Sequence, residues 1–253
     1  MLSPDFFKSA FEISLFILFF LCLIHSYIVH GWQRTLREFA GGFTFTLLCE
    51  SAGVLSGAYV YPGFSIYVLS VPFVNPASWI ALIYIIMHLS DQIILSNKWF
   101  KNIKANSIFI PLFIIALTDA FIALGLDLVL DPLASIYNWW VWVPLREGVH
   151  TVIEGTVDPY NFDSLKFMVT PDNWLKNFFA PFFEGQLRYP TRILGIPLIN
   201  FIAWFVFVFV FTFQFRLVES KTKWTELKKT LVLWMLIIIS TPILCFILIY
   251  PNI

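Results

Sequence analysis

The chain has 253 residues, of which 59% are hydrophobic and only 13% are charged, and its formal net charge is zero. A mean hydropathy of +0.80 together with 29 phenylalanines excludes a soluble globular domain and predicts an integral membrane protein. No basic cluster is interleaved with aromatic residues, which excludes nucleic-acid binding.

Long apolar runs separated by short polar breaks predict membrane-spanning helices, because the strands of a membrane β-barrel would alternate over roughly ten residues. The runs long enough to cross the hydrocarbon core are 6–29, 36–58, 76–95, 108–130, 196–215 and 230–249. The first lacks a basic leader and is too long for a signal-peptide core, so we expect a retained helix. The predicted fold is all-α, a polytopic transmembrane helix bundle of about six spans in a single integral membrane domain, residues 1–253.

The basic residues predict how this bundle is oriented. The loop after the second run has none, whereas ten of the sixteen follow the first, third and fifth runs: Arg34, Arg37, Lys98, Lys101, Lys104, Arg216, Lys221, Lys223, Lys228 and Lys229. By the positive-inside rule these three loops are cytoplasmic. Both termini are therefore expected outside, in a multi-pass protein of the cytoplasmic membrane.

The fourth loop, residues 131–193, is long, aromatic-rich and expected on the outer side, and it includes Trp140 and Trp142. Tryptophan and tyrosine at this density are typical of the lipid headgroup region. Two interpretations stay open, an aromatic belt on the membrane surface and a lid over a lipid-accessible pocket.

An internal repeat relates residues 71–79 to residues 196–204. Each copy carries a proline in second place, then an asparagine and a tryptophan four residues apart: Asn75 and Trp79 in the first copy, Asn200 and Trp204 in the second. Proline suits a first helical turn, and asparagine can satisfy an unpaired backbone donor there. Two similar helix starts explain the motif, but a parallel repeat of helix pairs enclosing a shared site would explain it too.

Four carboxylates interrupt or end the apolar runs, namely Glu50, Asp119, Asp127 and Asp131. A charge near the bilayer centre costs about 3 kcal/mol or more, so such residues are expected to face the protein interior and to mark a functional site. Apart from Lys8 and Arg37 near the starts of two runs, the runs hold no lysine or arginine to neutralise them, which favours the protonated form that a general acid needs. Asp127 and Asp131 share a helix face near the membrane edge, so solvation of these two carboxyl groups is the alternative to burial. Pro132 is expected to end that helix.

Other chemistry-bearing residues are sparse. The cysteines lack metal-ligand spacing and the four histidines are scattered, so neither a metal site nor an organic cofactor is predicted. His88 and Asp91 could form a hydrogen bond or bind a metal. Gly53 and Gly57 fit either tight helix packing or room for a long, thin substrate. Nucleotide-binding, zinc-protease and serine-hydrolase motifs are absent from the sequence.

Several of these residues together resemble one family, the membrane carotenoid biosynthesis proteins that include carotenoid 1,2-hydratases of the CruF type and the archaeal bisanhydrobacterioruberin hydratase. The matching positions follow one another over most of the chain: Glu50, Gly53, Gly57, Tyr59, Tyr61, Val71, Pro72, Trp79, Asp127, Asp131, Pro132, Trp140, Trp142, Gly195, Ile196, Pro197, Asn200, Phe201 and Trp204. The chain departs from the family pattern by a long insertion at 143–188 and by lacking a glycine before Trp204.

The resemblance implies an enzyme that adds water to the terminal C1=C2 double bond of an acyclic carotenoid, either lycopene-type or a C50 bacterioruberin precursor. Its partners would be the carotenoid, water and the lipid bilayer. Glu50 is the expected proton donor, and Asp119 or Asp127 would orient water, with Asp131 as a further candidate acid. The expected substrate-binding residues are mostly aromatic: Tyr59, Tyr61, Trp79, Trp140, Trp142, Trp204, Asn75 and Asn200.

Two other functions are compatible with the same residues. Acids inside a repeated set of helix pairs also suit a proton-coupled or lipid transporter. A membrane protein that binds a carotenoid without changing it is the other alternative.

Overall fold

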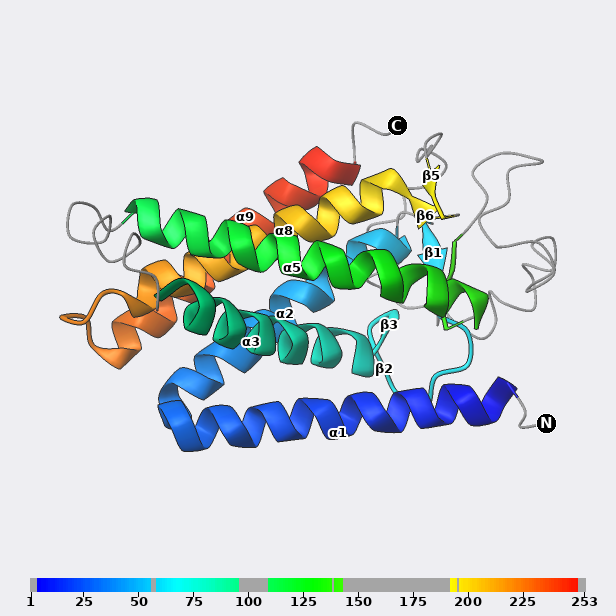
Figure 1. The fold of residues 1–253 in the computed structure, drawn as a ribbon, viewed down its shortest axis with the longest axis horizontal. Helices are drawn as coiled ribbons and strands as arrows, with labels where there is room; N and C mark the ends of the chain where they lie inside the picture. Colours follow the sequence, from blue (N-terminus) through cyan, green and yellow to red (C-terminus); the bar gives the residue numbers. More distant parts are fainter. Residues whose placement is uncertain are drawn as a thin grey trace.

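The computed structural model describes residues 4–55, 58–95, 109–137, 139–142, 192–194 and 196–249. Within them the helices are α1 (Pro4–His30), α2 (Trp32–Leu55), α3 (Val74–Leu95), α5 (Phe109–Ile136), α8 (Leu198–Glu219) and α9 (Glu226–Ile249). They pack side by side as an all-α bundle (Figure 1). Each predicted apolar run overlaps one of these helices, so the polytopic helical fold is confirmed. The insertion at 143–188 lies outside the described residues.

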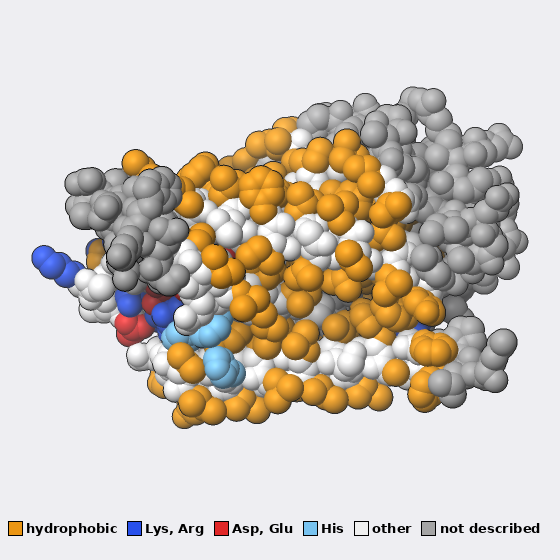
Figure 2. Space-filling view, viewed as in Figure 1, with side chains coloured by type: hydrophobic (Ala, Val, Ile, Leu, Met, Phe, Trp, Pro, Cys, Tyr) orange, Lys and Arg blue, Asp and Glu red, His pale blue; other side chains and the backbone are white. Residues whose placement is uncertain are grey.

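Five of the helices, all except α2, are long and apolar enough to cross a membrane. The exception carries four charged residues, Arg34, Arg37, Glu38 and Glu50. More than half of its residues are buried, because α2 contacts α1, α3, α8 and α9. Three of its charges, Arg37, Glu38 and Glu50, are buried and therefore face protein rather than lipid. Apolar side chains cover the middle of the visible surface (Figure 2).

The interior of the bundle lies between α2, α3, α5 and α8, and α1 and α9 cover it on either side. α1 packs on α3 and α2, whereas α9 packs on α2 and α8. Close approach at the centre depends on Gly42 of α2. A Cβ atom there would lie 2.7 Å from Cγ1 of Ile80 and 3.0 Å from Cζ of Phe211.

Short antiparallel strand pairs gather at one end of the bundle, which we call the strand end (Figure 1). β1 (Tyr59–Val60) pairs with β4 (Val141–Trp142) and so joins the segment after α2 to the segment after α5. β2 (Tyr67–Val68) pairs with β3 (Val71–Pro72), and β5 (Arg192–Ile193) pairs with β6 (Ile196–Pro197). α1 begins and α9 ends toward this end (Figure 1).

The opposite end of the bundle, the basic end, holds Arg37, Arg216 and Lys229 together with their acidic partners. Charged and histidine side chains are clustered there on the visible face (Figure 2). The described basic residues that follow the first and fifth runs thus share one end, as the orientation prediction requires. Lys98, Lys101 and Lys104 lie outside the described residues, and which end faces the cytoplasm stays a prediction.

The repeat seen in the sequence is also a repeat in the structure. A two-residue turn joins β2 to β3 before α3, and an equivalent turn joins β5 to β6 before α8. Leu69 and Leu194 occupy the same place in the two turns, with φ of 57° and 52°. A leucine in this left-handed region is uncommon, so finding it twice at equivalent positions supports duplication of a hairpin and helix unit.

Pro132 does not end α5, contrary to the prediction, because the helix continues to Ile136. Proline removes one backbone hydrogen bond and crowds the preceding turn, but packing of the following turn can outweigh that loss. Ala134 and Ser135 in that turn are buried, and the backbone N–H of Trp139 bonds the carbonyl of Ala134 at 2.9 Å.

We predict that Gly42→Ala lowers the free energy of unfolding by about 1–3 kcal/mol, because the added methyl group has no space beside Ile80 and Phe211. Thermal unfolding of the purified protein in detergent measures the change. Gly125→Ala in α5 is the matched control, since its Cβ would meet nothing within 4 Å. Equal stability of the two variants would contradict the proposed close contact.

Candidate functional site

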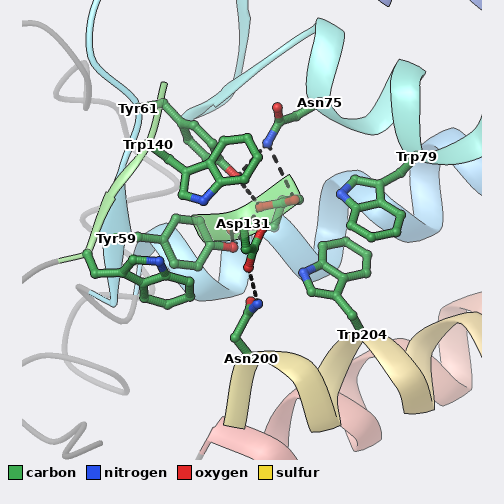
Figure 3. A pocket seen from close by; sticks show the side chains of 10 residues that line it. Tyr59, Tyr61, Asn75, Trp79, Asp131, Trp140, Asn200 and Trp204 are labelled. Carbon is green, nitrogen blue, oxygen red and sulfur yellow. Dashed lines mark hydrogen bonds between the residues drawn. The ribbon is translucent and has the colours of Figure 1, made fainter. Parts of the chain in front are cut away.

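A small cavity at the strand end is built from both halves of the repeat. Its lining residues come from α2 and the segment after it, from the first two turns of α3 and α8, and from the end of α5 with β4 and the residue before β4. Its walls combine carboxyl, amide and aromatic groups: Glu50, Tyr59, Tyr61, Asn75, Trp79, Asp131, Trp140, Trp142, Asn200 and Trp204 (Figure 3). We call this cavity the polar pocket. Its volume is about 10 Å³, which is near the space that one water molecule needs.

Glu50 is the centre of the first half of the polar pocket. Its Oε2 accepts hydrogen bonds from the hydroxyls of Tyr59, at 2.6 Å, and of Tyr61. The amide of Asn75 donates to Tyr61 Oη at 2.6 Å and reaches Glu50 Oε1 at 3.5 Å. Gly53 makes room for this arrangement, because a Cβ there would lie 2.6 Å from the ring of Tyr59.

Asp131 and Asp127 form the second half, one turn apart on α5 and both buried. The amide of Asn200 donates to Oδ2 of Asp131 and, at 3.4 Å, to Oδ2 of Asp127. The two carboxyl groups lie one helical turn apart and share the amide of Asn200 as their donor. They are therefore not solvated at the membrane edge, and the alternative of simple surface exposure is wrong.

Of the two repeat-related asparagines, Asn75 thus faces Glu50, and Asn200 faces the pair Asp127 and Asp131. The sequence suggested that they would satisfy unpaired backbone donors at the helix starts. This is wrong for Asn200, since α8 has no side-chain cap hydrogen bond and Asn200 faces Asp131. Asn75 likewise donates to side chains of the pocket. A buried carboxyl group without a hydrogen-bond donor costs more free energy than an uncapped helix end, because water can satisfy the helix end.

Aromatic rings close the rest of the pocket. Trp79 and Trp204 stack in parallel with ring centroids 4.0 Å apart, and they bring the two repeat units into direct contact (Figure 3). Trp142 lies against Tyr59 with centroids 4.9 Å apart, and Trp140 lies 6.2 Å from Tyr61. All eight residues expected to contact a substrate therefore line this one cavity, as Glu50 and Asp131 do.

A second, apolar cavity adjoins the polar pocket between α2, α8 and α9. Its volume is about 50 Å³, and it shares part of its wall with the polar pocket: Tyr59, Trp142, Asn200 and Trp204. Small or apolar side chains supply the remainder: Cys49, Gly53, Ala58, Ile199, Ala203, Phe207 and Leu248. We call it the apolar chamber. The polar pocket thus borders a space suited to hydrocarbon.

Asp119 does not belong to the polar pocket. It lies eight residues before Asp127 on α5, or roughly 12 Å along the helix axis. Arg216 of α8 donates from Nε to its Oδ2 at 3.0 Å and from Nη1 to Asp91 at 2.5 Å, and Ser90 also donates to Asp119. The expectation that no basic residue neutralises these acids is therefore wrong for Asp119.

The apolar runs did not predict Arg216 as the partner of Asp119, because Arg216 lies one residue past the end of the predicted run at 215. The repeat contained a signal for it. Asp91 and Arg216 both follow their asparagine, Asn75 or Asn200, by sixteen residues. Equivalent positions of two packed repeat units are natural candidates for contact, and here they carry opposite charges that pair.

No lysine or arginine lines the polar pocket among the described residues, so amide and hydroxyl donors alone face its carboxyl groups. Within the same part of the chain, no three His, Cys, Asp or Glu side chains converge as metal ligands. His88 lies beside His25, with ring centroids 5.8 Å apart, while Asp91 pairs with Arg216. The arrangement of the pocket can hold or move protons, orient one water molecule and place aromatic faces beside a positive charge.

Long apolar helices around a buried polar pocket define a multi-pass membrane protein with an internal site next to hydrocarbon. Residues 12–152, more than half of the chain, match the family described as carotenoid biosynthesis protein. The chain belongs to this family of carotenoid biosynthesis proteins. The match includes every pocket residue up to Trp142, whereas Asn200 and Trp204 lie beyond it. No curated protein and no solved structure matches the chain.

We predict that Asp119→Leu lowers the free energy of unfolding by about 3 kcal/mol, because it leaves the buried guanidinium of Arg216 with one carboxylate fewer. Thermal unfolding in detergent measures the loss. Adding Arg216→Met should restore part of the stability by removing the poorly paired charge. If the double variant is as unstable as the sum of the two single variants, the pair does not act as one unit.

Proposed function

We propose that the protein is a carotenoid hydratase, which adds water to the terminal C1=C2 double bond of an acyclic carotenoid. Membership of a carotenoid biosynthesis family supports the substrate class. The main support for the reaction is that carboxyl groups and aromatic faces meet in a cavity the size of one water molecule, beside an apolar chamber.

The proposed reaction has two steps. A carboxylic acid of the polar pocket protonates the less substituted carbon of the double bond, which leaves a tertiary cation on the other carbon. Water then attacks this cation and loses a proton, which gives a tertiary alcohol. General acids near the reacting bond contribute about 100-fold to 10,000-fold in rate, and aromatic faces stabilise the cation.

The aromatic residues of the pocket support a cationic intermediate, because their ring faces can stabilise a positive charge. The stacked indoles of Trp79 and Trp204 line the pocket together with Tyr59 and Tyr61. They exclude bulk water, so the cation would meet only the water that the pocket holds. Both cavities are smaller than the end of a carotenoid, so substrate binding requires some of these side chains to move apart.

The apolar chamber is the proposed path of the polyene chain. It lies between α2, α8 and α9, and its wall includes Leu248 of α9, a helix with many exposed apolar residues. A lycopene-type carotenoid or a C50 bacterioruberin precursor would enter from lipid and place its terminal double bond at the carboxyl groups. We further propose that the strand end faces the outside of the cytoplasmic membrane, since the basic end carries the positive charges.

We expect membranes that contain the protein and an acyclic carotenoid precursor to yield a product heavier by one water molecule, detected by mass spectrometry. Glu50→Gln should reduce this activity by about 100-fold or more, because the amide keeps the size of the side chain but can neither carry the charge nor transfer the proton. If folded protein leaves the precursor unchanged, the proposed hydratase function is wrong. Pigment bound unchanged would indicate a carotenoid-binding protein, and vectorial movement would indicate a transporter.

We also expect Ala203→Trp to lower kcat/KM for a full-length carotenoid by on the order of tenfold or more, because the indole would fill the apolar chamber and displace the reacting bond. A short acyclic isoprenoid with the same terminal group should be affected much less. Ile202→Trp is the matched control, since this neighbouring side chain is 43% exposed on the outer face of α8. Equal losses for both variants would argue against the chamber as the polyene path.

A further inference from the structure

We infer that the carboxyl groups of the polar pocket have opposite roles: the Asp127 and Asp131 pair holds and delivers the proton, and Glu50 is an ionised carboxylate that stabilises the cation and accepts the proton of water. This assignment rests on the proposed hydratase function and specifies its chemistry. It also reverses the expectation from the sequence that Glu50 is the proton donor.

The surroundings of Glu50 are those of an ionised carboxylate. Its Oε2 accepts from the hydroxyls of both Tyr59 and Tyr61, and the amide of Asn75 faces its Oε1. Tyr61 Oη already accepts from Asn75, which directs its own proton to Glu50. Burial raises the pKa of Tyr61 well above its ordinary value, so this phenol keeps the proton that it donates. Several donors on one carboxyl group favour its charged form.

The surroundings of the aspartate pair are the opposite. Asp127 and Asp131 are 0% and 4% exposed, and the only described donor that reaches them is the amide of Asn200. Asp127 Oδ1 has no hydrogen-bond partner within the described residues. Two adjacent carboxylates without a cation cannot both be ionised, and one shared proton converts their repulsion into a hydrogen bond. The pair is therefore arranged to hold a proton.

The repeat shows where the two halves differ. Glu50 and Thr46 are one turn apart on α2, just as Asp131 and Asp127 are one turn apart on α5. Thr46 is fully buried but carries a hydroxyl, which cannot share an acidic proton with its neighbour. The first half instead receives hydroxyl donors from Tyr59 and Tyr61. One half is thus built to retain a proton, and the other is built to retain a negative charge.

The reaction balances with these roles. The O–H bond of the aspartate pair breaks, and the π electrons of the double bond form the new C–H bond. The tertiary cation then takes an electron pair from water, and the proton that water releases goes to Glu50. Asp131 and Glu50 both line the polar pocket, so a second water molecule can carry this proton back to the aspartate pair. The net change is addition of one water molecule to the double bond.

Infrared spectroscopy tests the assignment on the unsubstituted protein without any substrate, so its result does not depend on hydratase activity. Protonated carboxyl groups give a C=O stretching band that ionised carboxylates lack. Aspartate labelled with carbon-13 at its side-chain carboxyl should shift a component of this band to lower frequency. Asp119 is ion-paired with Arg216 and is not expected to contribute. Absence of any aspartate-dependent component would overturn the proposal.

Two variants complete the test. Asp127→Asn combined with Asp131→Asn should remove the aspartate-dependent component, whereas Glu50→Gln should leave the band unchanged and reduce only the carboxylate absorption. Loss of the protonated band in Glu50→Gln would overturn the assignment, even if the double variant fails to fold. If the spectra agree with the assignment but no carotenoid is hydrated, the protonation states stand and the proposed function fails.

Discussion

Burying carboxyl groups inside a membrane bundle is the constraint on which the rest of this structure depends, because each one needs a donor or a cation that lipid cannot supply. The bundle meets this need in two ways. At the basic end Asp119 has the guanidinium of Arg216. At the strand end the donors that the described residues offer to Glu50 and Asp131 are amides and hydroxyls. The first arrangement pairs opposite charges across three helices, whereas the proposed proton transfer depends on the second arrangement, in which the described residues supply no cation.

The duplicated hairpin and helix unit explains why the donors are where they are. Asn75 and Asn200 come from equivalent first turns, and Trp79 and Trp204 meet where the two units contact each other. A duplicated unit supplies two similar half-sites around one cavity. Chemical difference then needs only a few substitutions, such as an aspartate on α5 at the position equivalent to Thr46 on α2.

Much of this arrangement could be predicted from the sequence, because the helices follow from apolar runs and the repeat is a local pattern. Ten of the residues expected at the site from the family resemblance and the repeat do line one cavity, while their roles stay a proposal. The apolar runs and the family resemblance do not predict Arg216 and its partners, since pairing of Asp91, Asp119 and Arg216 joins three helices far apart in sequence. The equal spacing in the two repeat units is the one local pattern that points to the pairing of Asp91 with Arg216. The continuation of α5 through Pro132 depends on tertiary burial of the next turn, which no local rule contains.

The charges of α2 also have a consequence for how the protein enters the membrane. This helix contributes Glu50 to the pocket, yet it is the only described helix that is not apolar enough to cross a bilayer by itself. Insertion of its buried Arg37, Glu38 and Glu50 as an isolated segment would be costly. α2 must therefore meet neighbouring helices such as α1 and α3 while it leaves the translocation machinery. Packing of α2 against these helices would then also bring Glu50 into the pocket, so the site would form as the bundle assembles.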